Sequence, residues 1–248
     1  GSSGIGRAAA ELMAQAGMKV GVLGRDEAEL AGVVEAIENQ GSEGAALVAD
    51  VAQVSEVEAA VARLVERFGR LDVVFANAGI NGTWAPLDEL TAEEWETVIG
   101  VNLTGTFLTL KYAFPHLKKR GGSVVVNASV NGTRVFTNAG ATAYASSKAG
   151  QVTMAKMLAL ELAKHRIRVN VICPGAIETP IHDKTEKREL DEAKEPVEYP
   201  EGNIPLTDGK PGSPQQVAQL VLFLASDAAS HITGTEMWID GGESLLMG

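Results

Sequence analysis

The sequence predicts an α/β fold built on a doubly wound parallel sheet, and two features of the chain lead to this prediction. Short apolar runs alternate with longer segments of helical periodicity along the whole chain. Most of the short runs are continuously apolar, as in strands that helices cover on both faces. Repeated alternation of strand and helix in one chain is typical of a parallel sheet flanked by helices.

The expected elements follow one another with little intervening sequence. The strands are the short apolar runs at residues 19–23, 44–49, 71–75, 123–127, 167–172 and 236–239. The helices are the longer periodic segments at residues 5–15, 27–39, 55–68, 92–117, 143–164 and 214–226. Charged residues and prolines accumulate at 181–211, which indicates an excursion from the sheet and not a second domain. Residues 1–248 are therefore expected to form a single domain.

Composition and charge argue against several classes of protein. With 45% hydrophobic and 21% charged residues, the chain of 248 residues has the composition of a globular domain. Its net charge of −11 argues against binding to nucleic acid or to an anionic membrane. No apolar run reaches the ~18 residues of a membrane span. Cys173 is the single cysteine and the four histidines are widely spaced, so we expect a cytoplasmic protein without a disulfide or a bound metal.

A glycine-rich turn opens the chain and leads into an alanine-rich helix: Gly1-Ser2-Ser3-Gly4-Ile5-Gly6. Glycines let the backbone approach a pyrophosphate, and the N–H groups and dipole of a helix N-terminus favour an anion. The turn therefore predicts a dinucleotide site. The alternative is a vector-derived Gly-Ser-Ser-Gly scar, but Ile5 and Gly6 continue the phosphate-binding pattern.

Tyr144 and Lys148 lie four residues apart in a helical segment, so both project from one face of the helix. A phenol has a pKa near ~10, and a neighbouring ammonium is expected to lower it toward the range useful for acid–base catalysis. By itself the pair would more simply be a surface tyrosine and lysine. Ser129 favours a site, because it follows the apolar run 124–128 at the carboxyl end of an expected strand, where ligands of open α/β sheets bind.

With these residues the sequence resembles the short-chain dehydrogenase/reductase family, which has a Rossmann-type sheet and the opening motif T-G-x-x-x-G-x-G. Gly4 and Gly6 match the last two glycines of that motif. The threonine, the first glycine and the first strand of the family would then precede residue 1. A doubly wound sheet without that central strand would leave backbone groups unpaired, so we expect the natural protein to carry an additional N-terminal segment.

The resemblance implies four catalytic residues. Ser129 would hydrogen-bond the substrate oxygen, Tyr144 would transfer the proton, and Lys148 would orient the cofactor and the tyrosine. Asn102 would support a proton-relay water beside the lysine, although alone it would be taken as a structural residue inside a helix.

Two departures from the family pattern are visible. Segment 130–143, between the serine and the tyrosine, is slightly longer than usual and is expected to reshape the pocket wall. Ala76 replaces the first asparagine of the family's N-N-A-G motif, which is expected to lower stability and not to abolish catalysis.

The resemblance also assigns cofactor contacts. The expected groups are Ser2-Ser3-Gly4-Ile5-Gly6 for the pyrophosphate, Asp50-Val51 for the adenine, Asn77-Ala78-Gly79 for the nicotinamide ribose, and Pro174-Gly175-Ala176-Ile177-Glu178-Thr179 for the nicotinamide. Ile177 and Thr179 would hold the amide and so select the face for hydride transfer. For Asp50 a helix N-cap is an equally good interpretation, and a proline–glycine pair is often only a turn.

The choice of cofactor depends on the residues that follow the strand at 19–23. Relatives that prefer NAD carry an acidic residue there for the ribose hydroxyls, whereas this chain has Gly24 followed by Arg25. A guanidinium can meet a 2′-phosphate with two parallel hydrogen bonds. We expect NADP(H) to be preferred, with NAD(H) still usable if Asp26 turns inward. A solvent-facing arginine paired with Asp26 or Glu29 is the alternative.

The predicted function is reversible hydride transfer between NADP(H) and a small-molecule carbonyl or alcohol substrate. The Y-x-x-x-K spacing favours carbonyl chemistry, because relatives that reduce enoyl double bonds usually space these residues more widely. A 3-oxoacyl thioester reductase and a sugar or polyol dehydrogenase both remain open. A catalytically silent cofactor-sensing or scaffold protein is the alternative, and the intact catalytic set argues against it.

The resemblance further implies an assembly and a moving segment. Family members are commonly homotetramers, and the helices at 92–117 and 143–164 would supply one interface, the second through Met154, Met157, Leu158, Leu160 and Leu162. A fully buried core helix is the alternative. Segment 181–211 follows the nicotinamide turn, where the family carries a substrate-covering lid, and its mixed charges at 183–195 indicate a solvated helix that opens and closes. A fixed surface loop is the alternative there.

Overall fold

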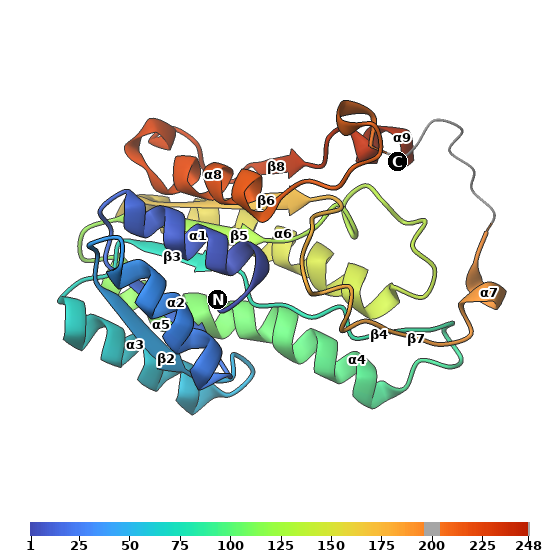
Figure 1. Cartoon of the computed structure of the whole chain (residues 1–248), viewed down its shortest axis with the longest axis horizontal. Coiled ribbons are helices and arrows are strands. Elements are labelled where there is room, and N and C mark those ends of the chain that lie inside the picture. Colours follow the sequence, from blue (N-terminus) through green and yellow to red (C-terminus); the bar gives the residue numbers. More distant parts are fainter. Residues whose placement is uncertain (196–203, 248) are drawn as a thin grey trace.

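Parallel strands form the middle layer of the protein, as the computed structural model shows for residues 1–195 and 204–247 (Figure 1). Four strands pair in the order β3 (Val73–Ala76), β5 (Gly122–Asn127), β6 (Ile167–Pro174) and β8 (Glu236–Ile239). A separate parallel pair consists of β1 (Val20–Gly24) and β2 (Gly44–Val48). The predicted α/β fold with a parallel sheet is therefore confirmed.

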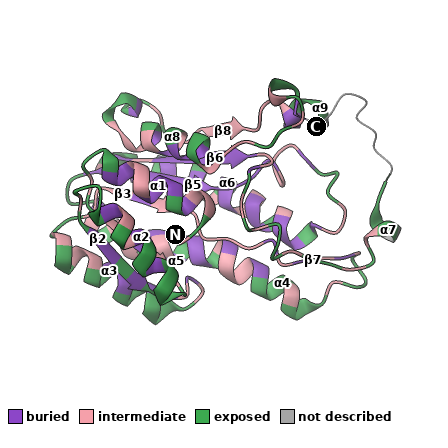
Figure 2. Ribbon diagram, viewed as in Figure 1, coloured by how far each residue is buried: buried purple, intermediate pink, exposed green. Residues whose placement is uncertain are grey.

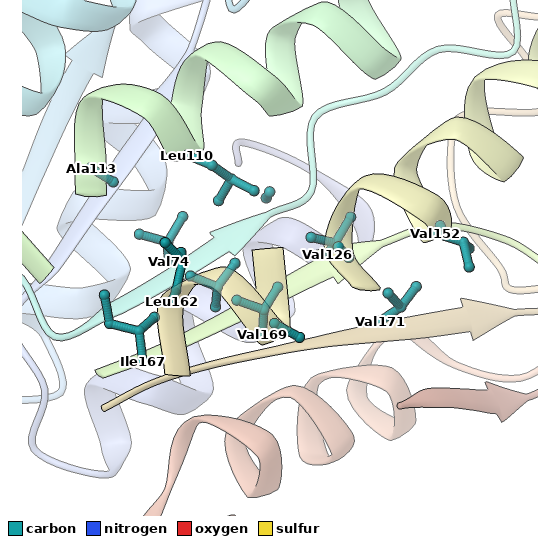
Figure 3. Packing of buried hydrophobic residues seen from close by; sticks show 14 of the residues in the cluster. Val74, Leu110, Ala113, Val126, Val152, Leu162, Ile167, Val169 and Val171 are labelled. Atoms are coloured by element: carbon teal, nitrogen blue, oxygen red, sulfur yellow. The ribbon is translucent and has the colours of Figure 1, made fainter. Parts of the chain in front are cut away.

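Helices cover both faces of the sheet, and the side chains of β5 alternate between the two layers. Val124 and Val126 pack in a cluster with side chains of α5 (Gly105–Leu117) and α6 (Thr142–Leu162) (Figure 3). Val125, between them, packs on the opposite face with side chains of α1 (Gly4–Gln15) and α8 (Pro214–Ala225). The middle of β5 is buried (Figure 2), and because both of its faces are covered the strand is apolar at these three positions.

The sheet is interrupted between β1 and β3, which do not pair with each other. A cavity of about 460 Å³ lies there, and its walls include Val20 and Val22 of β1 and Val73 and Phe75 of β3. A further parallel strand in this position would pair with both free edges. The additional N-terminal strand expected from the family motif would belong here, and its existence stays a prediction.

Most helix boundaries agree with the predicted ranges to within one or two residues. The remaining helices of the outer layers are α2 (Glu27–Glu38) and α3 (Val54–Phe68). The helix expected at 92–117 is divided into α4 (Ala92–Ile99), a π-helical turn η1 (Gly100–Thr104) and α5. A capping box between Thr91 and Glu94 fixes the start of α4.

The solvated helix expected at 183–195 is wrong. The backbone of β7 (Glu186–Lys187) pairs instead with β4 (Thr83–Trp84), and only α7 (Leu190–Ala193) is helical in this stretch. The pairing of β7 with β4 overrides the local helix propensity, because it provides hydrogen-bond partners for the backbone groups of this stretch. The charged sequence alone gives no sign of this pairing. Residues 196–203 of the expected excursion lie outside the described residues.

Short elements complete the structure. These are the 3₁₀ turns η2 (Ala163–His165), η3 (Pro205–Thr207) and η4 (Asp227–Ala229), and the C-terminal helix α9 (Glu243–Met247).

Candidate active site

Three side chains proposed from the sequence lie together at the carboxyl end of β5. Tyr144 and Lys148 project from α6 into the protein, where both are buried. Lys148 Nζ donates a 2.8 Å hydrogen bond to the carbonyl oxygen of Asn127, the last residue of β5, and lies 5.5 Å from the centroid of the Tyr144 ring. The Ser129 hydroxyl lies near enough to the phenol of Tyr144 to lower the pKa of the phenol. The strand end and one face of α6 thus bring a hydroxyl, a phenol and an ammonium into one small volume.

Burial dominates the electrostatics of this group. Burial raises the pKa of Tyr144, and the neighbouring Ser129 hydroxyl only partly offsets this effect. Burial also lowers the pKa of Lys148 from 10.5 to about 8. The expectation that the ammonium lowers the pKa of the phenol is therefore wrong for this structure. The phenol is kept protonated at neutral pH, which is the form that can give a proton to a carbonyl oxygen.

Asn102 lies behind Lys148 in the π-helical turn η1 and is fully buried. Its Oδ1 accepts from the backbone N–H of Ile80 at 2.8 Å, and its Nδ2 donates to the Ile80 carbonyl at 2.9 Å and to Ser147 Oγ at 2.9 Å. A Cβ on Gly79 would lie 3.4 Å from both Asn102 Oδ1 and Lys148 Nζ, so Gly79 lies against both side chains.

The long segment 130–143 is anchored on both sides of the site. Near its start, the backbone N–H of Asn131 donates to Ser129 Oγ at 3.1 Å, and the Arg134 guanidinium stacks 3.6 Å from the ring centroid of Trp238 on β8. Gly132 has φ +83°, and a Cβ there would lie 2.2 Å from the Ala145 carbonyl oxygen of α6. Only glycine allows the segment to cross α6 this closely.

The glycine turn at the start of α1 fits a bound pyrophosphate. Ser3, the N-cap of α1, makes no side-chain hydrogen bond to the helix, so no capping side chain occupies its first N–H groups. Gly4 has φ +51°, and a Cβ there would lie 3.1 Å from Thr179 Cγ2. A Cβ on Gly6 would lie 2.6 Å from Asn77 Nδ2. Three segments that the resemblance assigned to one cofactor are therefore in contact, and Ser2 and Ile5 belong to the same turn.

The neighbouring asparagines link this turn to the catalytic group. Asn77 Oδ1 accepts from Asn127 Nδ2 at 2.8 Å, and Asn127 Oδ1 is buried without a partner among the described residues. Ala78 and Gly79 continue the segment toward Lys148. An unpartnered hydrogen-bond acceptor next to the glycine turn, called the glycine cradle below, is what a site for a polar ligand provides.

The segment expected to hold the nicotinamide is a turn that leaves β6. Pro174 ends the strand, and the backbone N–H of Gly175 donates to the Ile239 carbonyl at 3.1 Å. Ile177 is buried and bridges to Gly212, while the backbone N–H of Ala176 donates to Glu243 Oε2 at 3.0 Å.

Asp50 and Val51 lie at the end of β2, where the resemblance places the adenine. Asp50 Oδ1 accepts from the N–H of Ala52 at 2.9 Å. The N-cap of α3 is Gln53, so the interpretation of Asp50 as a helix cap is wrong. Val51 is buried, and a Cβ on Gly105 would lie 2.8 Å from its Cγ2.

Arg25 is exposed directly after β1 and forms no ion pair within the described parts of the chain. Asp26 is the N-cap of α2, and its Oδ1 accepts from the N–H of Glu29 at 2.9 Å. Glu29 Oε2 accepts from Ser2 Oγ at 2.6 Å. Both acids expected as alternative partners of the arginine are therefore engaged elsewhere.

Sequence reasoning missed three residues that support the site. In the sequence, Asn127 was treated only as part of an apolar run. A polar residue directly before Ala128 and Ser129 could have indicated that it belongs to the site. Glu243 holds the turn after β6 from the far end of the chain. Gln151 lies one turn after Lys148 on the same face of α6, and its spacing could have shown this.

The fold and the site define the class of protein. A glycine cradle at a helix N-terminus and a buried tyrosine–lysine pair with a serine lie at the carboxyl ends of parallel strands, which is the arrangement of a dinucleotide-dependent oxidoreductase.

Comparisons with known proteins agree with this class. A family model described as enoyl-(acyl carrier protein) reductase matches residues 1–244. A 3-ketoacyl-ACP reductase from Sinorhizobium meliloti 1021 is 53% identical, with a TM-score of 0.96 over 99% of this chain and 96% of that one. Levodione reductase from Leifsonia aquatica is 38% identical over 250 residues, which are 98% of this chain and 91% of that protein. A 3-ketoacyl-ACP reductase from Brucella melitensis, solved with NADH, is 30% identical, with a TM-score of 0.85 over 98% of this chain and 95% of that one.

The chain belongs to the short-chain dehydrogenase/reductase family. It is an NAD(P)(H)-dependent oxidoreductase that acts on carbonyl or hydroxyl groups. In the described residues, no helix combines the length and the apolar character that a membrane crossing needs.

Proposed function

We propose that this chain reduces a small-molecule carbonyl compound with NADPH, and oxidises the alcohol in reverse, through Ser129, Tyr144 and Lys148. One observation carries the proposal. These three side chains meet in a buried group at the end of β5, directly beside the glycine cradle of α1. Asn102 supports them from behind Lys148.

The roles follow from the chemistry of each side chain. In the direction of reduction, the Ser129 hydroxyl donates a hydrogen bond to the carbonyl oxygen, and Tyr144 Oη gives its proton to the same oxygen. When bound, NADPH supplies the hydride that forms the new C–H bond. The Lys148 ammonium stabilises the phenolate that remains, so negative charge in the buried group is balanced. A silent sensor protein would need none of these groups.

The cofactor residues fit one extended dinucleotide. The turn Ser2–Gly6 and the N-terminus of α1 would hold the pyrophosphate, and Asp50 and Val51 would meet the adenine. The nicotinamide half would contact Asn77, Ala78, Gly79, Tyr144, Lys148, Pro174, Gly175, Ile177 and Thr179. The contacts of Gly4 with Thr179 and of Gly6 with Asn77 support this assignment, because they join the two halves.

The preference for NADP(H) over NAD(H) rests on the end of β1. Arg25 is exposed and has no ion-pair partner in the described chain, whereas Asp26 caps α2 with its carboxylate. The residue that could restore an NAD preference is thus turned toward its own helix. A free guanidinium at this position favours a 2′-phosphate.

The substrate class is the finer part of the proposal. We rank 3-oxoacyl thioesters first, because the 53% identical relative is a 3-ketoacyl-ACP reductase. We place the enzyme in the cytoplasm, where such substrates and NADPH occur.

A panel assay tests the proposal. Acetoacetyl-coenzyme A, cyclohexanone and fructose are offered with NADPH and with NADH, and oxidation is followed at the nicotinamide absorbance. Turnover of acetoacetyl-coenzyme A with NADPH at the highest kcat/KM is expected. A higher value for the ketose would reverse the substrate ranking, and no turnover of any carbonyl by a protein that binds NADPH would favour the silent alternative.

A further inference from the structure

A fully buried glutamine joins the catalytic helix to the turn that carries Asn102. Gln151 lies on α6 three residues after Lys148, and its relative exposure is 0%. Its Nε2 donates to the backbone carbonyl of Asn102 at 2.8 Å and to Thr106 Oγ1 at 2.7 Å. Thr106 Oγ1 in turn donates to the same carbonyl at 2.7 Å.

This contact completes a closed polar network between α6 and η1. From the same helix, Ser147 Oγ accepts from Asn102 Nδ2 at 2.9 Å and donates to the Tyr144 carbonyl at 2.7 Å. Asn102 is thus held by its side chain through Ser147 and by its main chain through Gln151. All members of the network are buried, so water does not compete for these hydrogen bonds.

Gln151 is not explained by stability alone. Its Oε1 is buried and has no partner among the described residues, and an orphaned acceptor costs about 1–3 kcal/mol. The other buried positions further along α6 are apolar: Val152, Ala155, Ala159 and Leu162. A methionine of similar volume would fill the space of Gln151 without that cost. What only an amide supplies here is the pair of N–H donors that meet Asn102 and Thr106.

The position of Asn102 depends on an irregular turn. η1 is π-helical, and such turns are wider than the α-helix and frequently occur at functional sites. The wide turn places Asn102 so that its amide meets both backbone groups of Ile80, beside Gly79 and Lys148. Donors from Thr106 and Gln151 stabilise the Asn102 carbonyl in this geometry.

We propose that Gln151 is a positioning residue of the reaction, which holds the π-helical turn so that Asn102 stays aligned with Ile80, Ser147 and Lys148. This rests on the proposed function, since it deepens the role given to Asn102. Without the amide donor the turn can relax toward a regular helix, and the proton path behind Lys148 is disturbed while the cofactor cradle at α1 is untouched.

The test compares Gln151→Met with Asn102→Ala and with the double variant. Gln151→Met is expected to lower kcat for acetoacetyl-coenzyme A about tenfold, with the KM and the Kd for NADPH within twofold of the wild type. Because Gln151 acts through Asn102, adding Gln151→Met to Asn102→Ala should cost less than twofold more. Ser123→Ala removes a buried hydrogen bond to the Leu224 carbonyl away from the site, and it should leave kcat unchanged.

The positioning role of Gln151 and the proposed function are contradicted by different results. Full additivity of the two substitutions, or an unchanged kcat in Gln151→Met, would overturn the positioning role. An Asn102→Ala variant with normal kcat would remove the role of Asn102 on which this inference rests, whereas a wild type that binds NADPH but turns over no carbonyl compound would contradict the proposed function itself. A measurement without substrate guards against a folding defect: amide hydrogen exchange of Ile80 and of residues 100–106 should accelerate at least tenfold in Gln151→Met, whereas exchange in α8 should not change.

Discussion

Tyr144 carries the proton in the proposed reaction, and Tyr144→Phe removes that proton while keeping the packing of the ring. Turnover is expected to fall by at least ~10²-fold, with NADPH binding preserved. Steady-state kinetics and a fluorescence titration of NADPH measure the two effects. Near-normal turnover in the variant would remove Tyr144 from its role.

Arg25 decides the cofactor in our interpretation, because its guanidinium has no ion-pair partner in the described chain and stands at the end of β1. Arg25→Ala is expected to weaken the binding of NADPH by about ten- to a hundredfold, the value of one or two charged hydrogen bonds. The affinity for NADH should stay nearly unchanged. Paired titrations of both cofactors against wild type and variant check this. Equal losses of affinity for the two cofactors, or a wild type that prefers NAD(H), would show that Arg25 does not bind the 2′-phosphate.

Lys148 links catalysis to stability. Burial lowers its pKa from 10.5 to about 8, so between these values the unfolded chain holds a proton that the folded protein has released. The free energy of unfolding contributed by this group therefore rises from pH 8 to pH 10.5, and below pH 8 the buried ammonium costs about 3 kcal/mol.

Lys148→Met removes that cost together with the hydrogen bond to Asn127. We expect the variant to be inactive but more stable than the wild type by about 1–2 kcal/mol at pH 7, with the difference shrinking toward pH 10.5. Urea unfolding across this range measures it. Lys156→Met, at a half-exposed lysine of the same helix, is the control and should show no such trend. A variant less stable than the wild type at every pH would mean that the hydrogen bond outweighs the burial.

The segment that follows the nicotinamide turn is anchored to the rest of the protein at residues 186–188. β7 pairs with β4, and Arg188 donates to both carboxylate oxygens of Glu94, at 3.0 and 2.9 Å, at the start of α4. The hydrogen bond from Arg188 lowers the pKa of Glu94 to about 2, so this ion pair persists over the whole range of an assay. A lid, if it closes, must hinge beyond Arg188.

Saturating NADPH and substrate are expected to slow amide exchange at residues 189–195 and 204–211, and to leave 186–188 unchanged. Hydrogen exchange read by mass spectrometry resolves these segments. Exchange that is the same with and without ligands throughout 189–211 would support the fixed surface loop.

Exposed apolar side chains on α6 and α5 favour self-association of the protein. Met157 is 70% exposed, Leu160 84% and Phe107 47%. Of the five residues expected on this surface, Leu162 is buried and Leu158 packs against the core, so the interface is narrower than the sequence suggested. The alternative interpretation, in which the helix expected at 143–164 is a fully buried core helix, is wrong because Met157 and Leu160 are exposed.

We propose a homotetramer with this surface as one interface. Light scattering at micromolar concentration should give four times the mass of the chain, and Leu160→Glu should give a smaller species. Val54→Glu places the same charge on an exposed position of α3 and should leave the assembly intact. A wild-type monomer would refute the tetramer.

The parallel α/β fold and most of the candidate site could be predicted from the amino-acid sequence. Apolar runs and helical periods are local properties, and they placed the strands and helices to within a few residues. Ser129, Tyr144, Lys148 and Asn102 were identified through the resemblance to the family, and the structure brings them together.

Features that depend on neighbours distant in the sequence could be recognised only in the folded protein. The pairing of β7 with β4 replaced an expected helix, and burial reversed the expected direction of the Tyr144 pKa shift. The amide of Gln151 found its partner on η1, 49 residues away in the chain. Such effects arise from desolvation and long-range hydrogen bonds, which exist only after the chain has folded and therefore leave no local pattern in the sequence.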